Sequence, residues 1–364
     1  MLRGLCLVLM TIDHLPRNFL QPFTNQSLGF FSAAEGFVFI SGMVSGWVFG
    51  RVLLQQGPAV TRRRIFGRIR DIYLTQLFLY TAILVSGLSS SMTGPPARSF
   101  WTNWWRGALL MERPSLFGIL PMYCVFLLFT PLVLAQLAKT REWLVWMSSL
   151  TLWLAAQFGL GNPEGHLSWV QLGLFNLFAW QLLFVAGVYF GFRRRSSRQP
   201  WFSESRALFL VSVLVALLLF MIRHPGRIFG HSSLLDMDVA LHTWKNIVHP
   251  LRLIDFAAVV VILSYLPRFL DEVLAAFWPF RLLSLLGRHS LQVFAWSVAL
   301  HYAAFSFSGW DSLAPLMKTL LVIFATASLV VPAWFHACIQ DFRKRRASQP
   351  PALLGANAAC LQPD

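Results

Sequence analysis

Two side chains able to do acid–base and anion chemistry are expected on one face of the first helix. Arg3 and His14 are eleven residues apart in a segment that is otherwise mostly apolar. At about 100° per residue, eleven steps make three turns plus roughly 20°. The guanidinium and the imidazole therefore share a face, with Leu7 and Met10 between them, and Asp13 precedes the histidine. Ionisable residues at membrane depth are costly and by default indicate a functional site.

A second carboxylate, Glu35, lies near the start of the apolar segment 29–54. It is seven residues before Gly42, which is the first of three glycines spaced four residues apart, the others being Gly46 and Gly50. A stripe of small residues lets another helix approach closely. We expect the first helix to be that neighbour, because only a short connection separates the two.

An imidazole beside a carboxylate is a reasonable general base. The acid would fix the tautomer of His14, so that its free nitrogen can take a proton from a hydroxyl. Asp13 and Glu35 are both candidates for that acid, and the spacing does not choose between them. The alternative is that Asp13 and His14 only cap a helix end.

The composition is that of a membrane protein. Of 364 residues, 56% are hydrophobic and 12% charged, whereas about 25% are charged in soluble domains. The formal net charge of +15 could indicate nucleic acid, but the basic residues gather at the ends of apolar segments. That placement follows the positive-inside rule, so we expect membrane lipid, and not nucleic acid, as a partner.

The apolar segments predict an all-α, polytopic integral membrane protein with about ten transmembrane helices. The expected helices cover residues 2–15, 29–54, 70–90, 116–138, 142–159, 171–192, 205–222, 251–266, 282–303 and 313–339. Alternate connections hold twenty Lys and Arg against eight in the other set, which predicts that both termini are cytoplasmic.

The chain divides into a membrane domain, 1–342, and a basic cytoplasmic tail, 343–364, that is expected to be disordered. The first helix stops before Pro16, short of the roughly 20 residues needed to span a bilayer. We therefore expect either that the natural protein begins upstream of Met1 or that this helix enters from a thinned interface.

Two further groups of residues invite a binding interpretation. Arg68 belongs to a basic run over 62–70 that could hold the phosphates of a cytosolic nucleotide cofactor, although such runs more often only mark topology. Four histidines follow at 224, 231, 242 and 249. Their spacing matches no metal-site pattern, so no metal is expected.

These residues resemble a known group of proteins. Arg3-Gly-Leu leading to Ile-Asp-His14 is similar to the opening helix of the membrane acyltransferase superfamily. A closer resemblance, to the OpgC family, rests on four stretches spread over the membrane domain. They are Ser32–Gly42, Leu120–Tyr123, Phe178–Phe184 and Gly287–Phe294.

The resemblance implies an enzyme of the bacterial inner membrane, a multi-pass acyltransferase that modifies osmoregulated periplasmic glucans or a similar envelope polysaccharide. The acyl group would be succinyl or another short acyl, with cytosolic acyl-CoA, most simply succinyl-CoA, as co-substrate and no bound cofactor. By motif, His14 is the base and Glu35 the acid of the second helix. Arg3 and Arg288, which match family positions, are candidates for binding acyl-CoA together with Arg68 of the basic run.

One departure from the wider superfamily is that its final histidine is replaced by Ser297, with His301 one turn later. Two other function classes stay open at this point. A transporter or flippase for a glycan, a lipid-linked sugar or an organic anion would also suit a helical bundle with charges at membrane depth, although no inverted repeat is evident. A non-catalytic subunit of glucan synthesis would require those charges to be structural.

Overall fold

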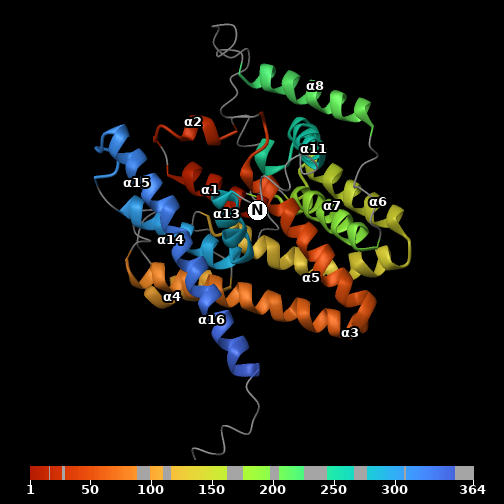
Figure 1. Cartoon of the computed structure of the whole chain (residues 1–364), viewed down its shortest axis with the longest axis horizontal. Coiled ribbons are helices and arrows are strands. Elements are labelled where there is room, and N and C mark those ends of the chain that lie inside the picture. Colours follow the sequence, from red (N-terminus) through yellow and green to blue (C-terminus); the bar gives the residue numbers. More distant parts are fainter. Residues whose placement is uncertain are drawn as a thin grey trace, which may run out of the picture.

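The computed structural model describes residues 1–15, 17–26, 29–87, 99–109, 116–161, 175–196, 205–224, 244–265, 277–306 and 309–348, and these ranges contain helices and no strands (Figure 1). The helices are α1 (Leu2–His14), α2 (Gln21–Thr24), α3 (Ala33–Val85), α4 (Phe100–Ala108), α5 (Ile119–Ala138), α6 (Glu142–Gln157), α7 (Leu177–Ser196), α8 (Arg206–Arg223), α11 (Pro250–Tyr265), α13 (Trp278–Arg288), α14 (Ser290–Ser306), α15 (Pro315–Ser328) and α16 (Val330–Ser348).

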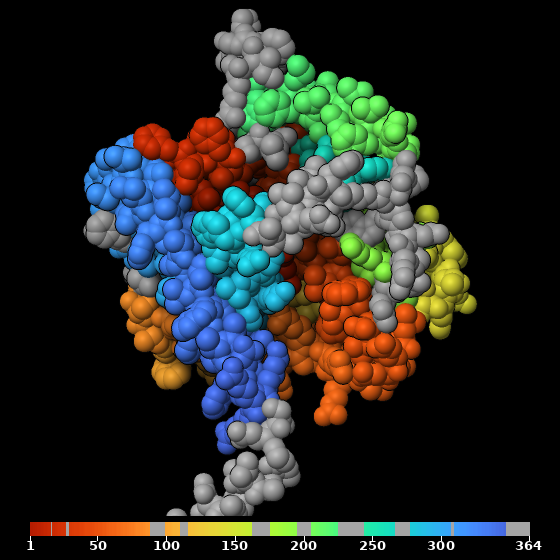
Figure 2. Space-filling model, in the orientation of Figure 1, coloured from red at the N-terminus to blue at the C-terminus, as the bar shows by residue number. Residues whose placement is uncertain are grey.

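Four helical segments in the described ranges are long and apolar enough to cross a membrane: α3, α5, α8 and the segment Pro315–Arg346 that joins α15 to α16. In Figure 2, α8 lies along one edge of the molecule and α15 and α16 run down another side. Large apolar side chains are exposed on these outer helices, including Leu214 and Leu218 of α8 and Phe324 of α15. A lipid environment accounts for such surfaces, since soluble monomers rarely expose contiguous apolar patches.

The expected helix boundaries are wrong in three places. The segments 29–54 and 70–90 form one bent helix, α3, whereas 282–303 is broken into α13 and α14 at His289, and 313–339 into α15 and α16 at Leu329. The basic run over 62–70 therefore lies on a helix and not in a connection. All these segments are uniformly apolar or helix-forming, so periodicity alone does not locate the breaks.

The bend in α3 has a local cause. Gly57 adopts φ 81° and ψ 175°, a backbone conformation that side-chain-bearing residues rarely enter, and Pro58 follows it. Proline removes a helical N–H donor and disfavours helical geometry in the residue before it. Residues 33–56 and 58–85 consequently form two limbs that diverge at this point (Figure 1).

The glycine stripe of α3 packs against α7, and our expectation that α1 would be its neighbour is wrong. A Cβ on Gly42 would lie 2.1 Å from the carbonyl oxygen of Phe184, and one on Gly46 2.1 Å from that of Val188. The contact is reciprocal, because a Cβ on Gly187 would lie 2.1 Å from the carbonyl oxygen of Phe39. Small residues on both helices allow this approach, so the glycines of α7 as well as those of α3 determine which helices pair.

Replacing Gly46 by alanine should destabilise the protein by about 1–3 kcal/mol, since backbone atoms of α7 occupy the position of the new Cβ. Gly67→Ala is the matched control. Gly67 lies on the same helix with no atom within 4 Å of its ideal Cβ, and alanine there should stabilise by roughly 0.5–1 kcal/mol through helix propensity. Thermal unfolding of the two purified variants in detergent tests this, and equal melting temperatures would contradict it.

The first helix lies between α3 and the C-terminal helices. A Cβ on Gly4 would lie 2.0 Å from the carbonyl oxygen of Leu283 in α13, and Cys6 faces Gly36 of α3. Leu7 and Met10, the residues between the two ionisable groups, are buried. Packing against several helices therefore fixes the rotation of α1 about its own axis. The same contacts fix the directions in which the Arg3 and His14 side chains point.

Candidate functional site

Asp13 and His14 form the last turn of α1. The next residue, Leu15, is extended (φ −103°, ψ 90°), as the steric demands of the following proline in the sequence require. Oδ1 of Asp13 accepts a hydrogen bond of 2.5 Å from the hydroxyl of Thr24, the last residue of α2. This hydrogen bond holds the end of α2 against the C-terminal end of α1.

His14 lies beside His301 of α14. The His301 Nδ1 donates a hydrogen bond of 2.7 Å to the His14 carbonyl oxygen, and the two ring centroids are 6.0 Å apart in an edge-on arrangement. The His14 ring itself makes no hydrogen bond to any residue that the structure describes. Its nitrogens therefore keep their capacity to bind a hydroxyl, and His301, one turn beyond Ser297, holds the backbone beneath the ring.

Glu35 has other partners than the imidazole. Arg252 of α11 binds its Oε1 through Nη2 and, at 2.9 Å, through Nε, while Ser32 binds Oε2 through its hydroxyl and, at 3.0 Å, through its backbone N–H. The side chains of Glu35 and Arg252 are fully buried. Of the two acids considered from the sequence, neither Glu35 nor Asp13 bonds to His14, so the expected acid–imidazole pair is not formed.

The bonds between Ser32 and Glu35 are a helix N-cap. In a capping box the N-cap hydroxyl and a Glu three residues later satisfy otherwise unpaired N–H groups. The pattern Ser-x-x-Glu before an apolar run was readable in the sequence and would have predicted this role. What the sequence could not show is that Arg252, 217 residues away, neutralises the same carboxylate.

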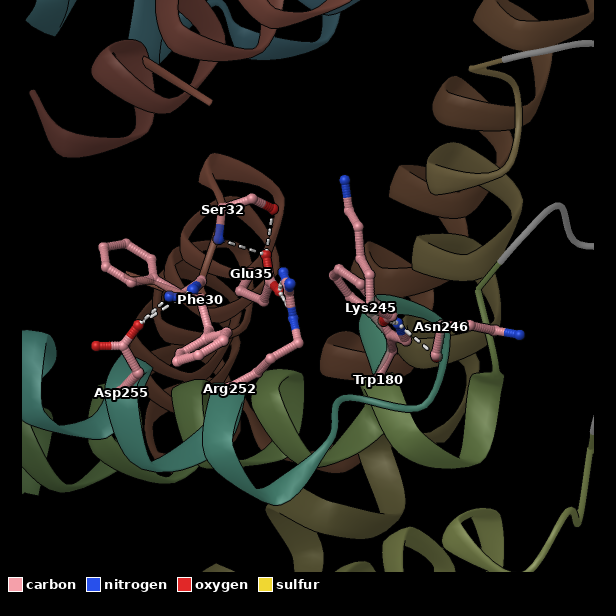
Figure 3. Close-up of polar contacts among 9 residues, drawn as sticks. Phe30, Ser32, Glu35, Trp180, Lys245, Asn246, Arg252 and Asp255 are labelled. Carbon is pink, nitrogen blue, oxygen red and sulfur yellow. Dashed lines mark hydrogen bonds and ion pairs between the residues drawn. The ribbon is translucent and has the colours of Figure 1, made fainter. Parts of the chain in front are cut away.

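Asp255, one turn after Arg252, holds the chain just before α3. Its Oδ2 accepts the backbone N–H groups of Phe30, at 2.6 Å, and Phe31, at 3.2 Å. Gly29 approaches the same carboxylate so closely that a Cβ there would lie 2.3 Å from Oδ2. Figure 3 shows both carboxylates, Glu35 and Asp255, between α11 and the start of α3. The sequence signal for these contacts is a pair of charged residues one turn apart in the apolar segment 251–266.

A lysine also interacts with these charged side chains. The ammonium of Lys245, in the turn before α11, interacts electrostatically with Asp13, Glu35 and His14. Burial lowers the pKa of this ammonium, and the Glu35 carboxylate opposes the shift. We call the set Asp13, His14, Lys245 and His301 the outer cluster, because it lies at the end of α1 expected to face the periplasm.

The other end of α1 carries a basic cluster. The Arg3 guanidinium lies 5.2 Å from the centre of the Phe37 ring and interacts with the Tyr123 hydroxyl and the Arg68 charge. The Arg288 charge acts on the terminal amine of Met1. Arg3, Arg68 and Arg288, the three residues expected to bind acyl-CoA, thus surround the same end of α1, about 16 Å from His14 by the rise of eleven helical residues.

A histidine pair that no sequence pattern predicted adjoins the basic cluster. The Nδ1 atoms of His289, in the break after Arg288, and His336 of α16 are 2.8 Å apart, and Gln292 lies 3.3 Å from the other nitrogen of His336. Among the described residues, no group of three or more His, Cys, Asp or Glu could hold a metal ion. His231 and His242 lie outside the described residues.

The sequence matches the family described as OpgC protein over residues 1–341, which includes α1, both clusters and α16 as far as Asp341. The chain belongs to the OpgC family. No curated protein and no solved structure matches it. Membership in this family, together with the long apolar helices, supports a membrane location. Membership also supports glucan modification by an acyltransferase.

Within this OpgC protein, α1 connects the outer and basic clusters. The end of α1 at Arg3 is cationic, which suits a phosphate-rich anion. The end at His14 carries an imidazole without a hydrogen-bond partner among the described residues, which suits proton abstraction.

Proposed function

We propose that this OpgC protein transfers a succinyl or another short acyl group from acyl-CoA to hydroxyls of a periplasmic glucan. The observation that carries the proposal is the arrangement along α1, with Arg3 beside Arg68 at one end and His14 in the outer cluster at the other. A donor made in the cytoplasm and an acceptor outside it would meet within the membrane, and free CoA would not be released outside.

In this mechanism the acceptor hydroxyl donates its proton to the His14 ring as its oxygen adds to the thioester carbonyl carbon. The tetrahedral intermediate then collapses, the C–S bond breaks, and the CoA thiolate takes up the proton from the imidazolium. General-base catalysis of this kind contributes about 10²–10⁴-fold in rate. Glu35 acts at a distance, since its bonds to Ser32 and Arg252 hold the start of α3.

Mass spectrometry of periplasmic glucans from bacteria with and without this gene tests the proposal. Loss of an acyl mass on deletion, restored by the wild-type gene, is the expected result and identifies the acyl group. Glucans that disappear altogether from the periplasm would instead favour the transporter. Unchanged glucans and unchanged surface polysaccharides would contradict the enzyme.

Arg288→Gln is expected to raise KM for the acyl-CoA donor by about tenfold while changing kcat little, since one charged hydrogen bond to a phosphate contributes about 1.5–3 kcal/mol. Arg206→Gln, at the start of α8 and outside the basic cluster, is the matched control. Initial rates in membrane vesicles at varied donor concentration provide the measurement. A donor KM equal to that of the wild type would remove Arg288 from the donor site.

A further inference from the structure

The short turn that carries Lys245 is held in place by side chains of α7 and the chain before it. The indole N–H of the buried Trp180 donates to the carbonyl oxygens of both Lys245, at 3.1 Å, and Asn246, at 3.0 Å (Figure 3). The backbone N–H of Asn176 also donates to the Asn246 carbonyl, at 3.2 Å. The backbone of Lys245 is therefore fixed relative to the middle of the bundle.

Helix α6 fixes the rest of the same turn. Gln157 donates to the carbonyl oxygen of Ile247 at 2.8 Å, and the indole of Trp153 donates to that of Val248 at 3.0 Å. Val248 is fully buried with φ 48°, a left-handed conformation that is unfavourable for a β-branched residue. Strain of this kind persists only where the surroundings over-determine it, and it concentrates at functional sites.

The side chain of Lys245 has no hydrogen-bond partner within the described residues. In Figure 3 it extends from the turn with its ammonium away from the Glu35–Arg252 pair. Its electrostatic neighbours are already bound elsewhere, Asp13 by Thr24 and Glu35 by Ser32 and Arg252. The Arg252 guanidinium is paired with Glu35, whereas the Lys245 ammonium interacts electrostatically with His14 and makes no hydrogen bond to a described residue.

We propose that Lys245 is a further catalytic residue, whose ammonium donates a hydrogen bond to the thioester carbonyl oxygen as acyl transfer makes that oxygen negative. The inference rests on the proposed function. When the acceptor oxygen bonds to the carbonyl carbon, the π electron pair moves to the carbonyl oxygen, and the adjacent ammonium stabilises that charge. The pair returns when C=O re-forms and C–S breaks, so the lysine begins and ends the cycle protonated.

The arrangement supplies what addition to a carbonyl requires. A base removes the hydroxyl proton, and a pre-positioned donor meets the developing oxyanion without having to reorganise. His14 lies on α1, whereas Lys245 lies in a turn of a different part of the chain. Hydrogen bonds from Trp180, Gln157 and Trp153 to carbonyl oxygens of this turn fix its backbone. Such donors act on kcat, because the charge they stabilise exists only in the transition state.

The test compares Lys245→Met, Lys245→Gln and Lys245→Arg with the wild type in membrane vesicles, using succinyl-CoA as the probe and periplasmic glucan as acceptor. Lys139→Met, an exposed lysine at the end of α5, is the control for loss of a positive charge. Gel filtration in detergent shows which variants are folded. If Lys245→Met does not fold, the comparison of Gln with Arg answers the same question, because only arginine keeps the charge.

We expect kcat to fall by about 10²–10³-fold in the Met and Gln variants, as when a single oxyanion donor is removed, with KM for succinyl-CoA nearly unchanged. The Arg variant should retain more activity than either. A raised donor KM with normal kcat would overturn the proposal in favour of a lysine that binds the free carboxylate of the acyl group, and wild-type activity in Lys245→Met would remove any role. A wild-type protein inactive with every acyl-CoA would instead refute the proposed function itself.

Discussion

Replacing His14 by alanine is expected to abolish acylation of periplasmic glucan, with a fall in rate of about 10²–10⁴-fold, while the protein still reaches the membrane. The imidazole lies edge-on to the His301 ring and makes no hydrogen bond to any described residue, because His301 binds the backbone carbonyl of His14 and not its ring. Its removal therefore takes away the proposed base without breaking a structural bond of its side chain. Mass spectrometry of glucans from a deletion strain carrying the variant gene measures the effect.

The matched control for this variant is His224→Ala. His224 follows the end of α8, where its ring packs against Phe220, and it belongs to neither the outer nor the basic cluster. Glucans acylated at the wild-type level by the His224 variant, and not by the His14 variant, would assign the loss to the base. Acylation that survives in His14→Ala, with normal protein abundance, would refute that role.

The second large effect is expected on stability, at the buried pair of Glu35 and Arg252. Arg252→Met leaves the carboxylate without its cation in a site that is fully buried, and breaking a buried pair in this way typically costs 3–5 kcal/mol, so we expect a loss of about that size. The double variant Glu35→Gln with Arg252→Met removes both charges and should recover much of the loss. Thermal unfolding in detergent of the two single variants and the double variant completes the cycle.

Surface pairs provide the comparison for this cycle. Arg17 and Asp311 are 2.6 Å apart with side chains 68% and 79% exposed, and an exposed pair contributes only about 0–1 kcal/mol. Arg17→Met should therefore barely change the melting temperature. If the losses at Glu35 and Arg252 instead add in the double variant, the two residues do not act as a pair and Glu35 is free for chemistry.

The buried pair also explains how the site keeps its shape. Arg252 and Asp255, one turn apart on α11, hold Glu35 and the backbone of Phe30 and Phe31. The same helix follows directly after the turn that carries Lys245. Helix α11 thus holds the start of α3, and the lysine of the outer cluster lies in the turn that leads directly into that helix.

Some features of this protein were set by the sequence alone, because they depend on local rules. Arg3 and His14 share a face of α1 since helical periodicity involves only the residues between them. The apolar segments indicated an all-helical membrane protein, and the stretches quoted from Ser32 to Phe294 were sufficient to indicate the OpgC family, which the match over residues 1–341 confirms. The Ser-x-x-Glu pattern around Glu35 is equally local, because a capping box involves only residues within one turn.

Other features were decided only by tertiary structure. The glycine stripe of α3 could have received any neighbouring helix, and the complementary Gly187 and Gly191 of α7 selected that one. Glu35 could have met His14 by depth, but a guanidinium 217 residues away outcompetes a neutral ring for a buried carboxylate. No local pattern around Lys245 predicts its interaction with His14, because that interaction arises from the packing of α6, α7 and α11 around one turn. Periodicity determines which side chains share a face of one helix, whereas close packing between helices determines which groups they meet.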